Sequence, residues 1–115
     1  MSDSEKYVAV IFTSTRLASS DAKYAEWSTR MAELVAKQSG YISHIGFRDS
    51  QTRQGVTISY FKDEESIRNW KALDEHLEAQ KLGREEFYDD YCVRIAVVNR
   101  EYSWSRNNNS FGRAQ

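Results

Sequence analysis

Proline is absent from the chain, and cysteine occurs once among its 115 residues, as Cys92. A single cysteine excludes an intrachain disulfide and suits a reducing compartment, so we expect a cytoplasmic protein. Long apolar runs are missing as well. The polar first residues lead into only six consecutive apolar residues, 7 to 12, which are too few for a signal-peptide core or a membrane span. We therefore expect no membrane partner.

Neither sign of charge dominates. Lysine and arginine number 16 against 17 aspartate and glutamate, for a formal net charge of −1. Because nucleic-acid binding depends on a basic surface, this balance predicts no nucleic-acid partner. The sequence also lacks a phosphate-binding glycine-rich loop, a dinucleotide fingerprint and any cysteine or histidine cluster with zinc spacing. Nucleotide chemistry and structural-metal chemistry are therefore not expected.

Aromatic residues, in contrast, are abundant. Three tryptophans, seven tyrosines and five phenylalanines make up 13% of the chain. Rings of this size fill a core, line a pocket or cover an interface, and composition leaves all three roles open. The length is typical of one domain with one core.

The first half of the chain predicts a strand, a helix and a hairpin. An apolar run predicts a strand over residues 6–15, buried on both faces in its first half. Apolar residues at steps of three and four predict a helix from an N-cap at Asp21 to about Gln38, ended by Gly40. Strands are expected over 41–48 and 56–61, with the polar stretch 49–55 as their connection.

The second half predicts a broken helix and a final strand. Asp63 is a candidate N-cap, and the helical pattern behind it shifts near residue 74, which indicates two short helices or one broken helix. An irregular stretch follows over 84–90, and then alternating apolar residues predict a strand from Val93 that reaches Tyr102. We therefore expect one domain at 6–104, with disordered ends at 1–5 and 105–115.

The order of these elements is βαββαβ, the α+β arrangement called ferredoxin-like, in which an antiparallel four-stranded sheet carries its helices on one face. Apolar residues stand on both faces of the predicted strands, so packing of the second face against another copy is expected to give a homodimer. His44 and Arg48 share one face of their strand. They lie either at the dimer seam, which we favour, or in a polar part of a cavity.

Several short motifs recur along the predicted domain: Gly40-Tyr41, Gly55 to Phe61, Trp70-Lys71, Glu75-His76, Ala79-Gln80, Gly83 and Tyr88 to Tyr91. In this combination, which covers roughly residues 6–103, the chain resembles the antibiotic biosynthesis monooxygenase family. This resemblance implies a dimeric α+β barrel, built as two ferredoxin-like sheets meet. Some members oxidise polycyclic phenols without a cofactor, and another branch degrades haem.

For this chain the resemblance implies a cofactor-free monooxygenase more than a haem-degrading one. In the haem-degrading branch, a histidine about ten residues beyond the tryptophan supports the substrate. Here that position holds Gln80, which is a poor iron ligand beside imidazole. A cofactor-free oxygenase instead needs a base and hydrogen bonds to a phenolate or enolate, because that anion can pass an electron to oxygen.

Four residues are candidates for such a site. His76 is the expected catalytic base, with a half-exposed structural histidine as the alternative. Trp70 is expected either as a pocket wall or as a core residue. Tyr60 and Ser14 are expected to bind substrate through their hydroxyl groups, although strand tyrosines ordinarily pack.

The sequence thus leaves two main functions open. The first is a small cofactor-independent monooxygenase that acts on an aromatic or quinol-type molecule in a pocket between sheet and helices. The second is a non-catalytic dimeric module that binds a small hydrophobic ligand or is purely structural.

Overall fold

The computed structural model describes residues 6–18 and 21–106. The ends expected to be disordered, 1–5 and 105–115, therefore lie outside the described residues except for Ser105 and Arg106. Along this part the elements are β1 (Tyr7–Arg16), α1 (Asp21–Ala36), β2 (Tyr41–Arg48), β3 (Gln54–Phe61), α2 (Glu64–Lys71), α3 (Asp74–Leu82), a π-helical turn η2 (Gly83–Phe87) and β4 (Tyr88–Val98). This order confirms the predicted βαββαβ arrangement.

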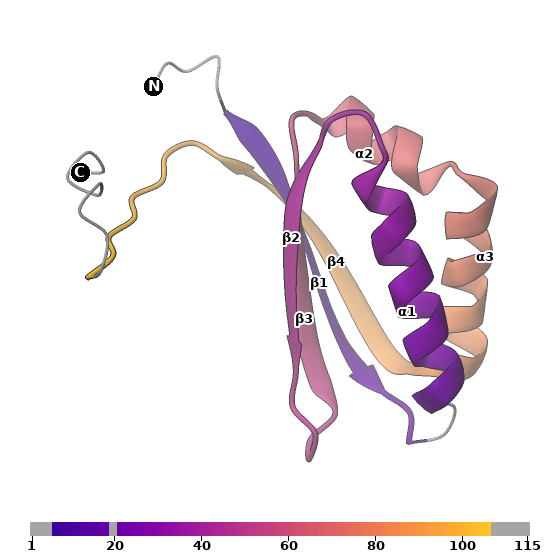
Figure 1. Cartoon of the computed structure of the whole chain (residues 1–115). Helices are drawn as coiled ribbons and strands as arrows, with labels where there is room; N and C mark the ends of the chain where they lie inside the picture. Colours follow the sequence, from indigo (N-terminus) through magenta and orange to yellow (C-terminus); the bar gives the residue numbers. More distant parts are fainter. Residues whose placement is uncertain (1–5, 19–20, 107–115) are drawn as a thin grey trace.

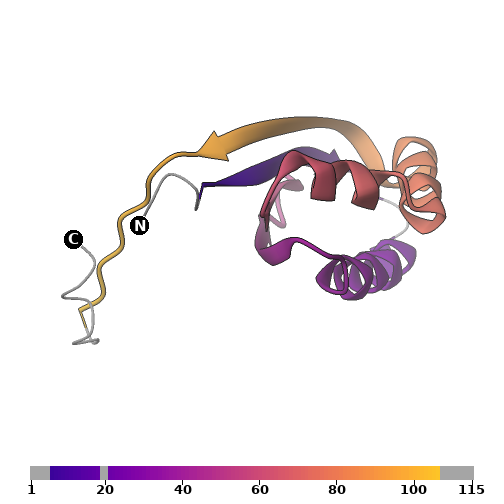
Figure 2. The ribbon, with the colours of Figure 1, turned by 90° about the horizontal axis from the view of Figure 1, so that it is seen from above.

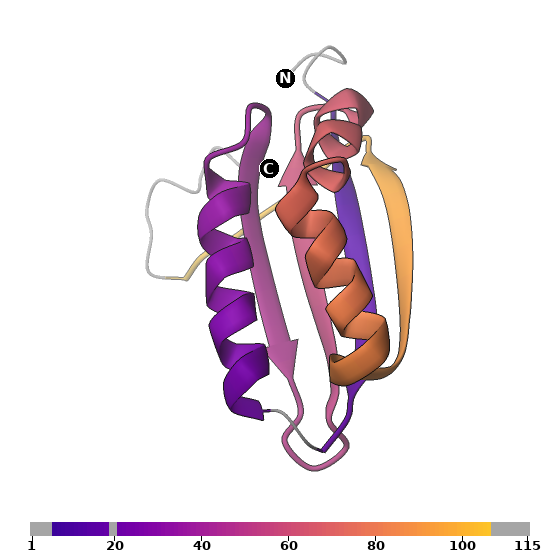
Figure 3. The same cartoon turned by 90° about the vertical axis from the view of Figure 1, so that its right-hand side faces the viewer.

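The strands form one antiparallel sheet in the order β2-β3-β1-β4. All labelled helices lie on the same side of this sheet (Figure 1), and the view from above shows the two layers. Figure 3 shows α1 and α3 side by side across that face. The ferredoxin-like fold class is therefore confirmed, with one covered face and one open face within the described chain.

The hydrophobic core lies at one end of the covered face. Val8 of β1 and Phe61 of β3 are direct cross-strand partners, and Val35 of α1 and Ile67 of α2 pack on them from above. Val10, Tyr41 and Trp70 pack around this cluster. Val8 and its neighbour Ala9 are both buried although they face opposite sides, but Tyr7 and Ile11, on the side of Ala9, are only partly buried. Full burial of both faces over the first half of the strand is therefore not seen.

Two local features, the N-cap of α2 and the end of α1, agree with the prediction from the sequence. The Asp63 carboxylate accepts a hydrogen bond from the backbone N–H of Ser66 at 2.9 Å and so caps α2. Gly40 follows α1 with φ of +87°, and a Cβ there would overlap the side chain of Ser66. Only glycine combines this conformation with so close an approach.

Three boundaries differ from the prediction. Asp21 begins α1 as its first helical residue and is not its N-cap. Residues 83–87 form a π-helical turn where an irregular stretch was expected. The helical pattern that shifts near residue 74 corresponds to two short helices, which is one of the two predicted alternatives. The last strand begins earlier than expected, at Tyr88, and ends at Val98 instead of reaching Tyr102. Val98 pairs with Tyr7 at the start of β1, so among the described residues no strand continues beside the chain beyond Val98.

The pairing register shows on which face of the sheet each strand residue lies, because directly paired residues of neighbouring strands lie on the same face. Val56, Ile58 and Tyr60 face away from the helices, opposite the core residue Phe61 and its alternating neighbours. The same open face carries Ile11, Ile45 and Phe47, and Phe47 is 69% exposed. The open face is therefore apolar along β2 and β3, whereas β4 places Arg94 there as the cross-strand partner of Ile11. Burial of this face in a dimer stays a prediction.

Candidate functional site

Trp70, His76 and Gln80 form one cluster where α2 gives way to α3. Trp70 lies in the last turn of α2, and its indole lies 4.6 Å from the imidazole of His76 between ring centroids, with the planes tilted by 51°. Gln80 stands one turn beyond His76 on α3, and its Nε2 lies 3.1 Å from His76 Nδ1. The structure therefore brings two of the four predicted site residues into contact.

The surroundings of His76 keep its imidazole neutral at physiological pH. Burial lowers the pKa of His76 to about 4, and the positive charge of Lys71 acts in the same direction. A hydrogen bond to the Lys71 backbone opposes this only in part. A neutral imidazole has one N–H donor and one acceptor nitrogen, so here the Gln80 amide donates to the nitrogen that is free to accept.

Beside the hydrophobic core, the covered face carries two small polar side chains, Ser59 and Thr57, which are called here the polar floor. Ser59 and Thr57 of β3 face the helices, as the cross-strand partners of Val10 and Phe12, and both stay partly exposed to solvent. Small hydroxyl side chains fill less space beneath helices than leucine or isoleucine would. Sequence reasoning missed these two residues, although their alternation with Val56, Ile58 and Tyr60 is visible in the sequence.

Ser14 lies on the same face, at the other end of β1 from the core. Ser14 lies six positions along the strand from Val8, a distance of roughly 20 Å. Its hydroxyl is buried and accepts a hydrogen bond from Arg48 Nη2 at 2.8 Å. Arg48 Nη1 also donates to the backbone carbonyl of Arg53 at 2.8 Å. Arg48 is thus on the covered face, as the cross-strand partner of Gly55, and not on the open face where a seam was favoured.

Aromatic rings and a second arginine complete this end of the covered face. Arg16 lies beneath the ring of Tyr24, with its guanidinium carbon 3.9 Å from the centroid. Burial, and then the neighbouring Tyr24, raise the pKa of Tyr88 above its ordinary value. Tyr88 therefore stays a protonated hydrogen-bonding group between α1 and the sheet.

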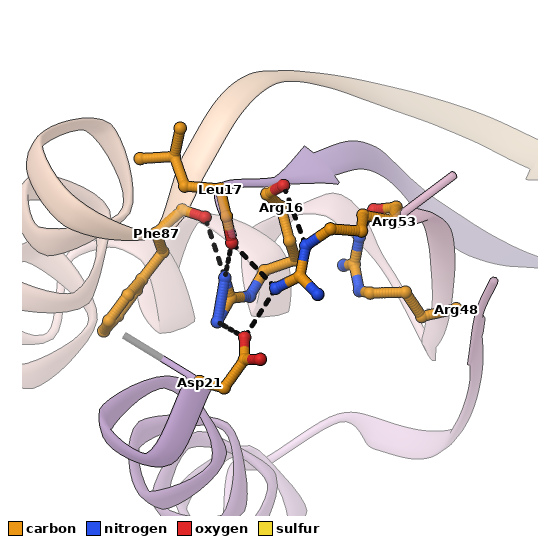
Figure 4. A network of polar contacts seen from close by, with 6 residues as sticks. All are labelled: Arg16, Leu17, Asp21, Arg48, Arg53 and Phe87. Carbon is orange, nitrogen blue, oxygen red and sulfur yellow. Dashed lines mark hydrogen bonds and ion pairs between the residues drawn. The ribbon is translucent and has the colours of Figure 1, made fainter. Parts of the chain in front are cut away.

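Beside these rings, a polar network surrounds the buried side chain of Arg16 (Figure 4). It connects β1 with α1, with η2 and with the turn between β2 and β3. The Arg16 side chain is 1% exposed and donates to the carbonyl of Phe87 at 3.1 Å and to the Asp21 carboxylate at 3.0 Å. Arg53 donates to the same carboxylate and to the carbonyl of Leu17. This explains why Asp21 is not the N-cap of α1: its carboxylate is taken by two arginines.

Tyr60 lies on the open face, where its ring meets that of Tyr7 edge to face with centroids 5.7 Å apart. Trp70 and His76 lie on the covered side, so within one chain Tyr60 does not meet them. Its assignment as a substrate-binding residue stays a prediction, as do those of Trp70, Ser14 and His76.

No described helix is long and apolar enough to cross a membrane. Within residues 6–18 and 21–106, no cluster of three or more histidine, cysteine, aspartate or glutamate side chains has the arrangement of a metal site.

Comparison with known proteins agrees with the fold described above. The model of the antibiotic biosynthesis monooxygenase family matches residues 7–82. The uncharacterised protein YqjZ of Bacillus subtilis (strain 168) is 36% identical over 103 residues, which are 90% of this chain and 89% of that protein. The jasmonate monooxygenase of Pyricularia oryzae is 29% identical over 92 residues, which are 78% of this chain but only 42% of that longer protein.

Solved structures show the same fold at low sequence identity. SO0527 from Shewanella oneidensis superposes with a TM-score of 0.71 at 9% identity, over 82% of this chain and 92% of that chain. SnoaB from Streptomyces nogalater, a cofactor-independent oxygenase, superposes with a TM-score of 0.63 at 16% identity, over 86% of this chain and 96% of that chain.

Proposed function

Because the chain belongs to the antibiotic biosynthesis monooxygenase family, we propose that it is a small monooxygenase that oxidises an aromatic or quinol-type molecule without a cofactor. The observation that carries the proposal is the neutral imidazole of His76, partly buried and held against the indole of Trp70. The cofactor-independent oxygenase SnoaB, which shares the fold, supports it.

In the proposed reaction the substrate lies between the helices and the polar floor of β3. A substrate hydroxyl takes the place of the Gln80 amide at the acceptor nitrogen of His76, so the imidazole acts as hydrogen-bond partner or base. The resulting anion reduces dioxygen directly. One oxygen atom joins the oxidised carbon as a carbonyl oxygen, and the other leaves as water with the hydrogen of that carbon and the proton that His76 took from the hydroxyl.

Trp70 is proposed as the wall against which the aromatic ring of the substrate packs. Ser14 is proposed as a hydroxyl contact at the far end, oriented by Arg48. Proton transfer needs a heavy-atom separation near 3 Å, so the substrate oxygen must approach the imidazole about as closely as the Gln80 amide does.

The test is oxygen uptake by the purified chain, without added metal or flavin, across a panel of quinols, anthrones and other phenols. The His76→Ala variant is compared with wild type and with Gln51→Ala, which changes an exposed residue in the connection between β2 and β3. We expect uptake in wild type and in Gln51→Ala, and at least a hundredfold loss in His76→Ala. No uptake above buffer for any member of the panel contradicts the proposal.

The second candidate is a non-catalytic module that binds a small hydrophobic ligand or has a structural role. It is favoured by the hydrogen bonds that His76 already makes with Gln80 and the Lys71 backbone, which suit a side chain that joins α2 to α3. Quenching of tryptophan fluorescence by a quinol that is bound but not consumed supports this module over the enzyme.

A haem-degrading role is disfavoured by the same cluster, because Gln80 stands where an imidazole would be needed. We also propose a cytoplasmic homodimer. Its support is the apolar open face, which no described element covers, and the fold shared with SnoaB.

A further inference from the structure

Three arginine side chains, Arg16, Arg48 and Arg53, gather at the end of the covered face that lies away from the hydrophobic core (Figure 4). The carboxylate of Asp21 pairs with Arg16 at 3.0 Å and also pairs with Arg53. Among the described residues, no carboxylate pairs with Arg48. These side chains therefore place three positive charges against one negative charge, and the charge of Arg48 is not compensated.

The guanidinium of Arg48 has one open edge. Nη1 donates to the backbone carbonyls of Ser14 at 3.3 Å and Arg53 at 2.8 Å, and Nη2 donates to the Ser14 hydroxyl at 2.8 Å. A guanidinium has five N–H donors. Nε–H and the second N–H of Nη2, which lie along one side of the plane, have no partner among the described residues. Two parallel N–H donors of this kind match the two oxygens of a carboxylate.

Gly55 leaves the room in which this guanidinium lies. Arg48 and Gly55 are cross-strand partners, and a Cβ at Gly55 would lie 2.7 Å from Arg48 Cζ. The arginine side chain thus crosses the backbone of β3 at a residue that has no side chain. Arg48 stays partly exposed, whereas Ser14, which it binds, is buried. The guanidinium is therefore held in place and still accessible to a ligand.

The polar floor connects Arg48 with the proposed site. Gly55 and Phe61 lie on the covered face, six positions apart on β3, which is roughly 20 Å, and the polar floor lies between them. Trp70 packs at the Phe61 end, and Arg48 lies at the Gly55 end. Both long side chains reach into this span from its ends. A substrate of two or three fused aromatic rings, more than a single ring, fits between them.

Two tyrosines adjoin the same guanidinium. The Arg48 guanidinium carbon lies 5.8 Å from the centroid of the Tyr24 ring, and the Tyr88 hydroxyl hydrogen-bonds to that of Tyr24. Burial raises the pKa of Tyr88, and the positive charges of Arg48 and Arg16 act against this rise. Aromatic rings beside a guanidinium exclude water, which strengthens its attraction for an anion. Arg48 is therefore a stronger anion site than an arginine in open solvent.

We propose that Arg48 binds a carboxylate of the substrate, so that the chain acts on aromatic acids in preference to uncharged phenols. The carboxylate lies along the open edge of the guanidinium, and the reacting hydroxyl lies at His76. This inference rests on the proposed function, because it names the substrate class of the same site. It gives Arg48 a role in specificity that is separate from its bonds to Ser14 and Arg53.

The first experiment measures binding without turnover. The probes are anthraquinone-2-carboxylate and its methyl ester, which share one ring system, differ in charge and are already oxidised. Quenching of tryptophan fluorescence gives the dissociation constant of each probe. We expect wild type to bind the acid about tenfold more tightly than the ester, and Arg48→Gln to bind the two about equally.

The ratio of the two dissociation constants is the readout, because Arg48→Gln also removes hydrogen bonds that Ser14 and Arg53 accept. A purely structural role would weaken binding of acid and ester alike and would leave this ratio unchanged. Arg48→Lys keeps the charge but lacks the paired donors, and we expect it to lower the ratio as well. Circular dichroism shows whether each variant is folded.

The matched control is Arg53→Gln. It removes the same charge from the same end of the face, but from a side chain that already pairs with Asp21. We expect it to keep the wild-type ratio. An equal fall of the ratio in Arg48→Gln and Arg53→Gln would assign the preference to the net charge of this end and overturn the contact with Arg48.

Oxygen uptake with the corresponding anthrones, the acid and its methyl ester, separates this inference from the proposed function. Uptake with equal kcat/KM for both, together with equal binding of the two probes to wild type, overturns the carboxylate site and leaves the monooxygenase intact. No uptake with either, together with tight binding of the acid that Arg48→Gln loses, overturns the proposed function and leaves the carboxylate site intact.

Discussion

The indole of Trp70 and the imidazole of His76 lie in contact, with 4.6 Å between ring centroids, although a helix break separates them in the chain. The break after Lys71 lets α3 turn, so a histidine six residues beyond the tryptophan reaches its ring. In one continuous helix, residues six apart point to different sides. Trp70 therefore packs on the hydrophobic core and also contacts His76, the proposed base.

The first prediction concerns the pH dependence of stability. The pKa of His76 is lowered to about 4 in the folded chain, against 6.5 in the unfolded chain. Between these values the unfolded state binds more protons, so the free energy of unfolding falls as the pH drops through this window. With a discount for partial solvent exposure, we expect a loss of about 1 kcal/mol from His76 between pH 7.5 and 5.

Urea denaturation at several pH values, with wild type and a His76→Gln variant, measures this loss. The variant is expected to show a flatter pH dependence over the same range. The matched control is His44→Gln, which removes the exposed histidine. Equal pH slopes for wild type and His76→Gln would show that His76 ionises freely in the folded state.

The second prediction concerns Trp70, which packs on the core cluster of Val8, Val35, Phe61 and Ile67 and also on His76. Trp70→Ala is expected to lower the free energy of unfolding by about 3 kcal/mol, because it leaves a cavity beside the core. Trp70→Phe keeps most of the ring volume and is expected to cost about 1 kcal/mol. Chemical denaturation measures both, with Leu77→Ala at an exposed position of α3 as control.

If Trp70 is also a pocket wall, Trp70→Phe is expected to raise KM for an accepted substrate more than it lowers kcat. A residue that only packs would leave both constants near their wild-type values in a variant that is still folded. Equal constants for wild type and Trp70→Phe would therefore assign Trp70 to the core alone.

The third prediction concerns Arg16, whose guanidinium is almost fully buried and bonded to backbone carbonyls and to Asp21. Arg16→Met is expected to destabilise the chain by about 2 kcal/mol, because the carbonyls of Leu17 and Phe87 each lose one of their two donors and Asp21 loses an ion-pair partner. The control is Arg68→Met. Arg68 pairs with Glu64 at 3.7 Å on the exposed surface of α2, and its loss is expected to cost less than 0.5 kcal/mol.

Comparable losses in Arg16→Met and Arg68→Met would show that the network in Figure 4 contributes little to stability. Thermal unfolding followed by circular dichroism suffices to rank the two variants.

The fold was predictable because its signals are local. The N-cap at Asp63 and the chain reversal at Gly40 each depend on neighbours within a few residues, and the structure has both. The alternation of Val56, Ile58 and Tyr60 likewise sets β3 without distant information. Such patterns act through backbone conformation and burial, which a sequence shows directly.

The site was less predictable because its contacts are distant in the chain. Arg48 lies 34 residues from Ser14, whose hydroxyl accepts its hydrogen bond, and no local pattern pairs them. The face of the sheet on which Arg48 and Tyr60 lie depends on register across three strands. The end of β4 at Val98 depends on where β1 begins, and not on the alternation that continues beyond it.

The last prediction concerns the open face. Phe47 is 69% exposed there, beside Ile45 and next to Val56 across the strand pair, and a contiguous apolar patch of this kind marks an interface. Phe47→Glu places a charge in the expected dimer seam, where desolvation without a partner is costly. We expect a chain that is folded but dissociates at least a hundredfold more readily than wild type, by sedimentation velocity. Leu77→Glu introduces the same charge at an exposed apolar position of α3 and is expected to leave the dimer unchanged. Equal dissociation of the two variants would place the interface elsewhere, and a monomeric wild type would show that the open face is not covered by a second copy at all.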